Sequence, residues 1–322
     1  MKKVILVILV IVLSACGGSK EPSSIDKKVD ELSIKNSYVF GKSGKHQVSY
    51  EYHLGTKIFF PTDISTQNPT PVVFFVPGYK MNKSDEYKTI IDFIASHGYT
   101  VIYAPDINKV AKADWYVDLV TKAAKEVGVV PYIDTTRIGV VGHSLGGGNS
   151  FYVLDKLSKN EGWGENGRFI MALDPYFPYG MSNEELKNLP QNTNVIMQKY
   201  NKDRSSDPRI GLTTYYLLDS ISDQQKDYQV YNDVNHYYVS EVFHYAQKIP
   251  EPKSVSMMQY ALKPLEALMD LTFEGNEDAR AVALEVGDDD PIANNSEEIK
   301  DQESYKYKCN AVDGNRFCEI LR

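Results

Sequence analysis

Short apolar runs alternate with helical patterns along most of the chain. Val72–Val76 and Phe169–Leu173 are continuously apolar, as expected of strands that are buried on both faces. Between such runs, apolar residues recur at helical spacing, as in Glu86–His97, which ends at Gly98. The pattern predicts strands at Val48–His53, Lys57–Pro61, Val72–Val76, Thr100–Ala104, Arg137–Val141, Phe169–Leu173, Asn194–Gln198 and Tyr228–Tyr231, and helices at Glu86–His97, Lys112–Val127, Leu145–Leu157 and Ser256–Phe273.

This alternation predicts the fold class. Strands that alternate with helices form a mostly parallel sheet with helices on both faces. We therefore expect an α/β fold in which the first two strands form an antiparallel edge. Ligands of such sheets lie beyond the carboxyl ends of the strands, so functional side chains are expected in the loops that follow the strands.

The regions outside this pattern divide the chain. Residues 16–34 are small, polar and charged, which indicates a tether, and residues 35–250 contain the sheet. Two prolines, at 250 and 252, then interrupt the pattern, so residues 251–322 are expected to form a helical extension and a tail. Near the end of the tail, Cys309 and Cys318 can form a disulfide in an oxidising compartment, or remain two free thiols.

Residues 1–15 resemble a bacterial lipoprotein signal peptide. Two lysines precede the apolar stretch Val4–Leu13, which is shorter than the roughly 20 residues of a membrane-spanning helix. Two small residues then lead to Cys16, as in a lipobox. The resemblance implies cleavage before Cys16, a lipid on its sulfur and, with Gly17 next, a location in the bacterial outer membrane. A plain secretory signal or a short anchor is the alternative.

The composition narrows the range of partners. The chain has 322 residues, of which 42% are hydrophobic and 24% charged, as in a globular protein with one large domain or two small ones. Its formal charge is −8, and an acidic surface repels phosphate backbones, so nucleic acid is not an expected partner. The expected partners are a lipid membrane, through Cys16, and a small-molecule or polymeric substrate.

The sharpest chemical signal is the motif Gly142-His143-Ser144-Leu145-Gly146, which follows a predicted strand and precedes a predicted helix. The flanking glycines allow the strained turn that exposes a nucleophilic hydroxyl above the sheet. The alternative is a glycine-rich turn that binds phosphate, but the Lys-Ser/Thr pair of a P-loop and the spacing of a dinucleotide site are missing here. We expect Ser144 to be a catalytic nucleophile.

A second signal is the loop Val76-Pro77-Gly78-Tyr79, which leaves an earlier buried strand. Acyl transfer by a serine needs two backbone N–H groups aimed at the oxyanion of the intermediate. Leu145, directly after the nucleophile, is expected to supply one N–H group and Tyr79 the other. The alternative is an ordinary Pro-Gly turn.

These segments resemble the α/β-hydrolase superfamily. The similarity lies in VVFFVPGY at 72–79, IASHGYTVIYAPD at 94–106 and IDTTRIGVVGHSLGGG at 133–148. It points to the branch that holds cutinase-like polyesterases, chlorophyllases, dienelactone-hydrolase-like proteins and platelet-activating-factor acetylhydrolases. The resemblance implies a Ser-His-Asp esterase or lipase mechanism without a metal or organic cofactor.

The general base of such a triad is a histidine, and the chain has six. His236 follows the last predicted strand after a short polar stretch, where a loop can hold its ring over Ser144. His244 lies in a helical pattern, Val239–Gln247, and is expected to be structural. The remaining histidines are His46 and His53 at the edge strands, His97 at a helix end, and His143, which is expected to pack beside the nucleophile.

Three aspartates compete for the acid of the triad. Asp174 follows the strand Phe169–Leu173, where a carboxylate is costly to bury without a partner. In the acetylhydrolase and chlorophyllase branches, which the chain resembles, the acid follows the corresponding strand. Asp203 and Asp207 follow the next strand, where most α/β-hydrolases and the polyesterases keep theirs. We place Asp174 first, with Asp203 and then Asp207 as alternatives.

Together these residues predict a membrane-anchored carboxylic-ester hydrolase that forms an acyl-enzyme on Ser144, with His236 as base. Its expected substrates are lipid-like, short-chain or polymeric esters. A peptidase or thioesterase on the same triad, and an inactive hydrolase scaffold that serves as a surface binding protein, are the alternatives. Aromatic residues that would suit an apolar or aromatic acyl group, or that simply cover the sheet, are Tyr79, Tyr176, Phe177, Tyr237 and Tyr238.

Overall fold

The computed structural model describes residues 40–53, 56–81, 83–103, 122, 132–200, 206–231, 234–240 and 258–284. All of them fall in the unit Phe40–Arg322. The predicted signal peptide, the tether and the cysteine-containing tail lie outside the described residues. Within the described part of the chain, no helix has both the length and the apolar character that crossing a bilayer requires.

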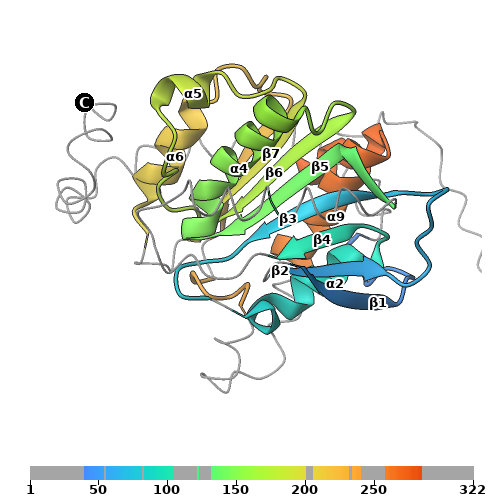
Figure 1. Ribbon diagram of the computed structural model, residues 1–322. Coiled ribbons are helices and arrows are strands. Elements are labelled where there is room, and N and C mark those ends of the chain that lie inside the picture. Colours follow the sequence, from blue (N-terminus) through green and yellow to red (C-terminus); the bar gives the residue numbers. More distant parts are fainter. Residues whose placement is uncertain are drawn as a thin grey trace, which may run out of the picture. The chain divides into compact units, whose positions relative to one another are not determined.

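Eight strands form a single sheet (Figure 1). They are β1 (Val48–His53), β2 (Thr56–Pro61), β3 (Thr70–Val76), β4 (Thr100–Tyr103), β5 (Ile133–His143), β6 (Gly167–Leu173), β7 (Thr193–Tyr200) and β8 (Lys226–Tyr231). Their order is β1-β2-β4-β3-β5-β6-β7-β8. β2 pairs antiparallel with both β1 and β4, and every other pair of neighbours is parallel. The predicted α/β fold with an antiparallel N-terminal edge is confirmed.

The strand β3 shows why the central strands are apolar throughout. All of its residues are buried, and successive side chains point to opposite faces of the sheet. Val73 and Phe75 join one hydrophobic core, while Phe74 and Val76 join the other. Because both faces of the strand are covered, the sequence is a continuous apolar run rather than an alternation of apolar and polar residues.

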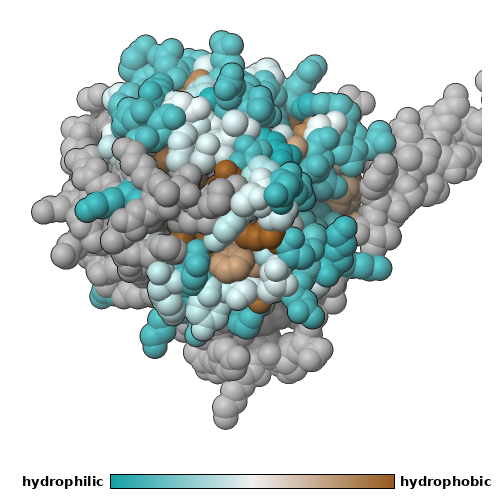
Figure 2. Space-filling view, turned by 45° about the vertical axis from the view of Figure 1, so that its right-hand side comes forward, coloured by the Kyte–Doolittle hydropathy of each residue, from teal (hydrophilic) through white to brown (hydrophobic). Residues whose placement is uncertain are grey.

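Helices cover both faces of the sheet (Figure 1). The core that contains Val73 is closed by α2 (Lys88–Ser96) and α9 (Lys263–Phe273). The opposite core is closed by α4 (Leu145–Glu161), α5 (Asn183–Lys187) and α6 (Pro208–Tyr216). Where Figure 2 shows described residues, small hydrophobic patches lie among hydrophilic side chains. Shorter elements are η1 (Ser84–Tyr87), η2 (Met258–Leu262), η3 (Glu277–Ala279) and α10 (Arg280–Ala283).

Several predicted boundaries differ from the observed ones. The predicted helix Glu86–His97 is a 3₁₀ turn, η1, followed by α2. β5 begins at Ile133 rather than at the predicted Arg137. Residues 134–137 are polar and only partly buried, so this part of the strand has no apolar run that would predict it. The short helices α5, α6 and α10 carry too little periodicity to be predicted. The predicted helix Lys112–Val127 lies outside the described residues apart from Lys122.

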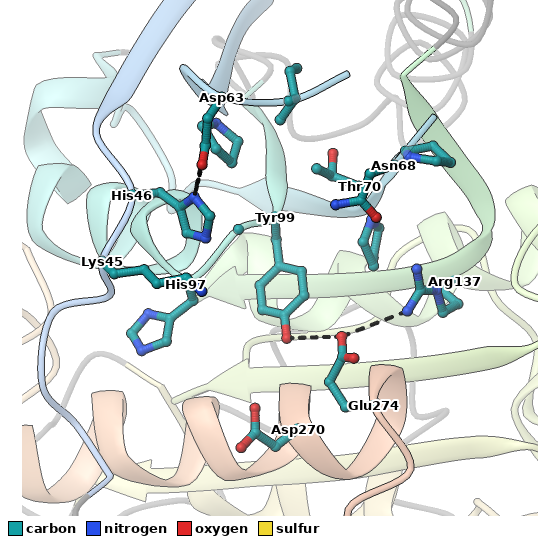
Figure 3. Close-up of a pocket in the computed structure, with 15 residues that line it drawn as sticks. Lys45, His46, Asp63, Asn68, Thr70, His97, Tyr99, Arg137, Asp270 and Glu274 are labelled. Carbon is teal, nitrogen blue, oxygen red and sulfur yellow. Dashed lines mark hydrogen bonds and ion pairs between the residues drawn. The ribbon is translucent and has the colours of Figure 1, made fainter. Parts of the chain in front are cut away.

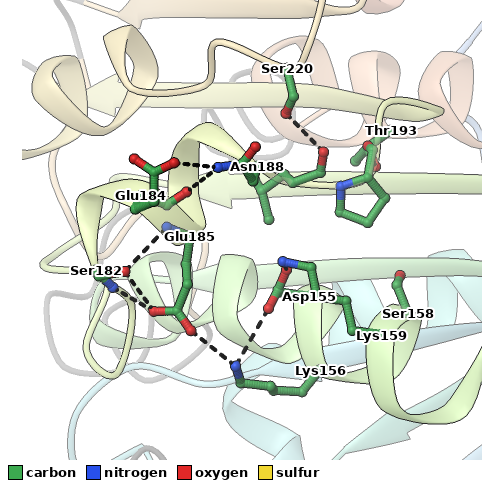
Figure 4. Close-up of polar contacts among 12 residues, drawn as sticks. Asp155, Lys156, Ser158, Lys159, Ser182, Glu184, Glu185, Asn188, Thr193 and Ser220 are labelled. Carbon is green, nitrogen blue, oxygen red and sulfur yellow. Dashed lines mark hydrogen bonds and ion pairs between the residues drawn. The ribbon is translucent and has the colours of Figure 1, made fainter.

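The helix α5 depends on polar contacts with its own N-cap and with α4 (Figure 4). The Ser182 hydroxyl accepts from the Glu185 N–H at 3.2 Å, and the Glu185 carboxylate accepts from the Ser182 N–H at 2.8 Å. Lys156 of α4 donates to the same carboxylate at 3.2 Å. The bond from the Ser182 backbone is the largest cause that lowers the pKa of Glu185 to about 2, so this anchor stays charged at neutral pH.

The amino-terminal ends of the parallel strands border a polar cavity of about 540 Å³ (Figure 3). The Glu274 carboxylate, just after α9, lies 3.5 Å from the Tyr99 hydroxyl and 3.6 Å from Nη1 of Arg137 on β5. Parallel strands all run the same way, so this cavity lies at the end of the sheet opposite to the predicted active site.

Near this cavity, Glu266 of α9 joins α9 to α2. Its carboxylate lies 3.1 Å from Nε2 of His97 and accepts a hydrogen bond from the Gly41 N–H. Burial alone would lower the pKa of His97, but the hydrogen bonds to Glu266 and to the Phe93 carbonyl outweigh burial and raise that pKa. Protonated His97 therefore stabilises the fold. This contribution is complete below the unfolded-state pKa of about 6.5 and disappears as the pH rises through the higher folded-state value.

The substitution Glu266→Gln should therefore destabilise the protein more at pH 6 than at pH 9. We expect a loss on the order of 1 kcal/mol at pH 6, because the pair is only partly shielded from solvent. Urea unfolding at the two pH values measures the difference. His97→Gln provides the control background, in which E266Q should have the same small effect at both pH values. An equal loss at pH 6 and pH 9 in the wild-type background would contradict the assignment.

Candidate active site

Backbone strain marks the carboxyl end of the sheet. Among the described residues, the non-glycine residues with positive φ are Lys80 at 62°, Ser144 at 56° and Asp174 at 45°. They follow β3, β5 and β6, which are neighbours in the sheet. Conformations of this kind cost of the order of 1 kcal/mol or more each and cluster at functional sites. This edge is therefore the candidate active site.

Ser144 stands in a tight turn between β5 and α4, with φ 56° and ψ −119°. Two nearby glycines make the turn possible. A Cβ on Gly146 would lie 2.0 Å from the Val76 carbonyl oxygen, and a Cβ on Gly142 would lie 2.3 Å from the Gly146 carbonyl oxygen. Ser144 is partly exposed, whereas the residues on either side of it are buried. This strand–turn–helix geometry presents a serine hydroxyl above the sheet.

The backbone of Ser144 is tied to the segment that follows β6. Its N–H donates to the Leu173 carbonyl at 2.9 Å, and its own carbonyl accepts from the Tyr176 N–H at 2.8 Å. Asp174 lies between these two partners in the sequence. The two bonds therefore hold the turn of Ser144 beside Asp174.

His236 lies against Asp174. Its Nδ1 atom is 2.6 Å from Oδ2 of Asp174, and the two side chains are 5% and 0% exposed. Because an ionised carboxylate only accepts, Nδ1 donates, and Nε2 of the neutral ring keeps the lone pair that can take a proton. The His236 ring centroid lies 4.6 Å from that of His143, the residue before Ser144. Of the two candidate acids that the structure describes, Asp174 and Asp207, Asp174 is the one that lies against His236.

The other carboxylate oxygen of Asp174 has partners of its own. Nζ of Lys199 lies 2.7 Å from Oδ1, and the Ser206 hydroxyl lies 3.2 Å from the same oxygen. Lys199 is on β7 and is 3% exposed. Sequence reasoning missed both residues, because the predicted strand ended at Gln198 and a following lysine is usually solvated.

A chain of hydrogen bonds joins the Tyr79 loop to His236. The Gly78 N–H donates to the Tyr87 hydroxyl at 2.9 Å, and this hydroxyl lies 2.8 Å from Nδ1 of His143. Nε2 of His143 lies 2.8 Å from the backbone carbonyl of His236, which can only accept. Nε2 therefore carries the ring proton, and in the neutral ring the Tyr87 hydroxyl donates to Nδ1. His143 thus connects two loops of the site through hydrogen bonds.

The predicted oxyanion donors are the backbone N–H groups of Leu145 and Tyr79, at this edge of the sheet. Leu145 is the first residue of α4, and the N–H groups of a first turn have no partner within the helix. In the Tyr79 loop, the Gly78 N–H donates to the Tyr87 hydroxyl and the Met81 N–H donates to the Gly78 carbonyl. The Tyr79 N–H has no acceptor among the residues that the structure describes. These positions, after β5 and β3, suit the predicted oxyanion donors.

The other predicted residues have different surroundings. Asp207 caps the N-terminus of α6 and pairs with Arg209 at 2.6 Å. His46 pairs with Asp63 at 2.7 Å beside the polar cavity at the amino-terminal ends of the strands. No group of three or more His, Cys, Asp or Glu side chains is arranged to hold a metal ion in the described parts of the chain. Outside the described residues lie Cys16, Asp203, His244, Cys309 and Cys318.

Removal of the Tyr87 hydroxyl should cost more stability than removal of a similar hydroxyl nearby. Tyr87→Phe leaves the buried Gly78 N–H and Nδ1 of His143 without their partner, so we expect a loss of about 2–4 kcal/mol. The matched control is Tyr103→Phe, because the one partner of the Tyr103 hydroxyl among the described residues is the Met81 carbonyl, at 3.0 Å. That variant should lose about 1 kcal/mol. Equal losses in urea unfolding would contradict the network.

The PET hydrolase-like family matches the chain over residues 36–259. The matched segment contains all strands of the sheet and the residues Ser144, Asp174 and His236. A comparison with curated proteins gave no match. Since the match spans most of the chain, and the mixed sheet is the one expected of an α/β-hydrolase, the protein belongs to the PET hydrolase-like family, a family of ester hydrolases.

Proposed function

We propose that the protein is a serine hydrolase that cleaves carboxylic esters through an acyl-enzyme on Ser144. The observation that carries the proposal is the 2.6 Å contact between Nδ1 of His236 and Oδ2 of Asp174, beside the strained turn of Ser144. This contact supports His236 as the general base and Asp174 as the acid that orients it. Membership of the family supports an ester, rather than an amide or a thioester, as the bond that is cleaved.

The reaction proceeds in two halves. Nε2 of His236 takes the Ser144 proton as Oγ attacks the ester carbonyl, and the N–H groups of Leu145 and Tyr79 stabilise the oxyanion. When the tetrahedral intermediate collapses, His236 gives the proton to the departing alkoxide, which leaves as an alcohol. His236 then removes a proton from water, which attacks the acyl-enzyme. A second collapse releases the carboxylic acid and returns the proton to Ser144.

A polymeric ester is the substrate class that the family favours. Tyr79 and Tyr237 are 48% and 43% exposed, so a large part of each ring faces solvent and can pack on an apolar or aromatic chain. Phe177 and Tyr238 are nearly buried, so they support the edge of the sheet rather than line a binding surface.

Ester turnover by residues 17–322 tests this proposal. The wild type should hydrolyse p-nitrophenyl acetate, butyrate or octanoate, and Ser144→Ala should show only the background rate. The turnover of Asp174→Asn should be about 10³–10⁴-fold lower than that of the wild type, because a neutral amide neither fixes the tautomer of His236 nor stabilises its charged form. Wild-type turnover equal to that of S144A, together with no labelling by a fluorophosphonate, would favour an inactive binding scaffold.

Asp203→Asn and Asp207→Asn are the matched controls for the acid, since each removes one carboxylate from the segment after β7. Both variants should keep most of the wild-type turnover. If D203N loses turnover while D174N keeps it, the acid is Asp203 rather than Asp174. Circular dichroism of each variant separates a loss of fold from a loss of chemistry.

We also propose that Cys16 carries a lipid that anchors the protein to the outer membrane of a bacterial envelope, where Cys309 and Cys318 can form a disulfide. The signal pattern before Cys16 supports this proposal. For the full chain expressed in a bacterium, Cys16→Ala should move the protein from the detergent phase to the aqueous phase in a Triton X-114 partition. Recovery of both proteins in the same phase would contradict the anchor.

A further inference from the structure

A lysine occupies a buried position directly beside Asp174. Lys199 is 3% exposed and lies on the same face of β7 as Val195 and Met197, which belong to the core closed by α4 and α6. An apolar side chain would continue this pattern. A buried ammonium is costly unless it is paired and hydrogen-bonded, so a lysine at this position needs a specific reason.

The contacts of Lys199 lead to the proposed acid. Its ammonium reaches Oδ1 of Asp174 at 2.7 Å, the Ser206 hydroxyl at 3.0 Å and the Ser206 carbonyl at 3.2 Å. The Ser206 hydroxyl also lies 3.2 Å from Oδ1. Oδ1 is therefore taken by Lys199 and Ser206, while Oδ2 faces His236 at 2.6 Å. The carboxylate cannot rotate without breaking these bonds.

We infer that Lys199 is a positioning residue that fixes the Asp174 carboxylate and offsets its negative charge, and thereby keeps His236 active as a base at lower pH. This inference rests on the proposed function of Asp174 and His236. The carboxylate alone would stabilise the charged imidazole with its full negative charge. The ammonium lies on the far side of the same carboxylate and offsets part of its charge. The protonated form of His236 therefore gains less electrostatic stabilisation, and His236 remains an unprotonated base at lower pH.

The other ionisable groups near Asp174, Lys199 and His236 do not change the effect of the Lys199 charge on His236. Burial raises the pKa of both Tyr200 and Tyr228, so these phenols stay neutral. Asp207 and Arg209 pair with each other and offset each other's charge. The described ionisable groups that lie near Asp174 or His236 include His143 on β5, Tyr200 on β7, Tyr228 on β8 and Tyr237 beside His236.

The pH dependence of kcat/KM for p-nitrophenyl butyrate tests the inference, because its acid limb reports the base of the free enzyme. In Lys199→Met the acid limb should move up by about one pH unit, so that turnover at pH 5.5, relative to the variant's own plateau, falls about tenfold. Lys199→Arg keeps the charge and should return the limb to the wild-type position. Lys199→Gln takes the place of K199M if the latter does not fold.

Two controls separate charge from packing. Lys226→Met makes the same change on β8, at a lysine that is 10% exposed and lies 3.5 Å from Asp223. Lys226 pairs with Val195, four residues before Lys199 and so about 13 Å along the strand from it. The acid limb of K226M should match that of the wild type. Ser206→Ala removes a neutral contact and should lower turnover without moving the limb.

Several results would overturn the inference. One is an acid limb that stays in place in K199M or K199Q while only the stability falls. Another is a wild-type acid limb above about pH 7, because an ordinary histidine titrates near 6.5 and the inference requires His236 to stay unprotonated at lower pH. This result would overturn the inference even if no Lys199 variant folds. If the wild type turns over and S144A does not, an unmoved limb refutes the role of Lys199 alone. No wild-type turnover refutes the proposed function and this inference with it.

Discussion

The carboxylate of Asp174 has no exposed surface, and a charge in that position must have partners. Isolated burial of a carboxylate costs several kcal/mol, which is a large part of the net stability of a domain. The sheet resolves this constraint because it places β5, β6 and β7 side by side, so that the residues at their carboxyl ends meet. His236 satisfies one oxygen of the carboxylate, and Lys199 with Ser206 satisfies the other. The orientation of the proposed base is thus a consequence of how the acid is buried.

The two ends of the sheet have different tasks. At the carboxyl end, Lys80, Ser144 and Asp174 hold unfavourable backbone conformations, which persist only when the surrounding structure fixes them. At the amino end, ordinary ion pairs join the sheet, α2 and α9 around a polar cavity, through Arg137 with Glu274 and His97 with Glu266. The two hydrophobic cores between these ends offset the free-energy cost of the strained backbone at the carboxyl end. Sites built on such rigid elements keep their geometry better than sites on loops alone.

The sequence predicts the sheet and the turn of Ser144 well, because both depend on local signals. A strand that is buried on both faces is a continuous apolar run, and a turn this tight needs glycines next to the serine. The partners of Asp174 are not local. Lys199 is 25 residues away in the sequence and His236 is 62 residues away, and only the strand order brings them together. For this reason the acid remained open among three aspartates, and neither Lys199 nor Tyr87 gave a signal of its role.

The central claim is that His236, held on Asp174, activates Ser144. The most direct measurement is to treat the protein with a fluorophosphonate and to locate the phosphonyl group by peptide mass spectrometry. We expect a single modification, on Ser144, that forms at a rate strongly reduced in His236→Ala. Absence of the modification, modification of another residue, or an unchanged rate in the H236A variant would contradict it.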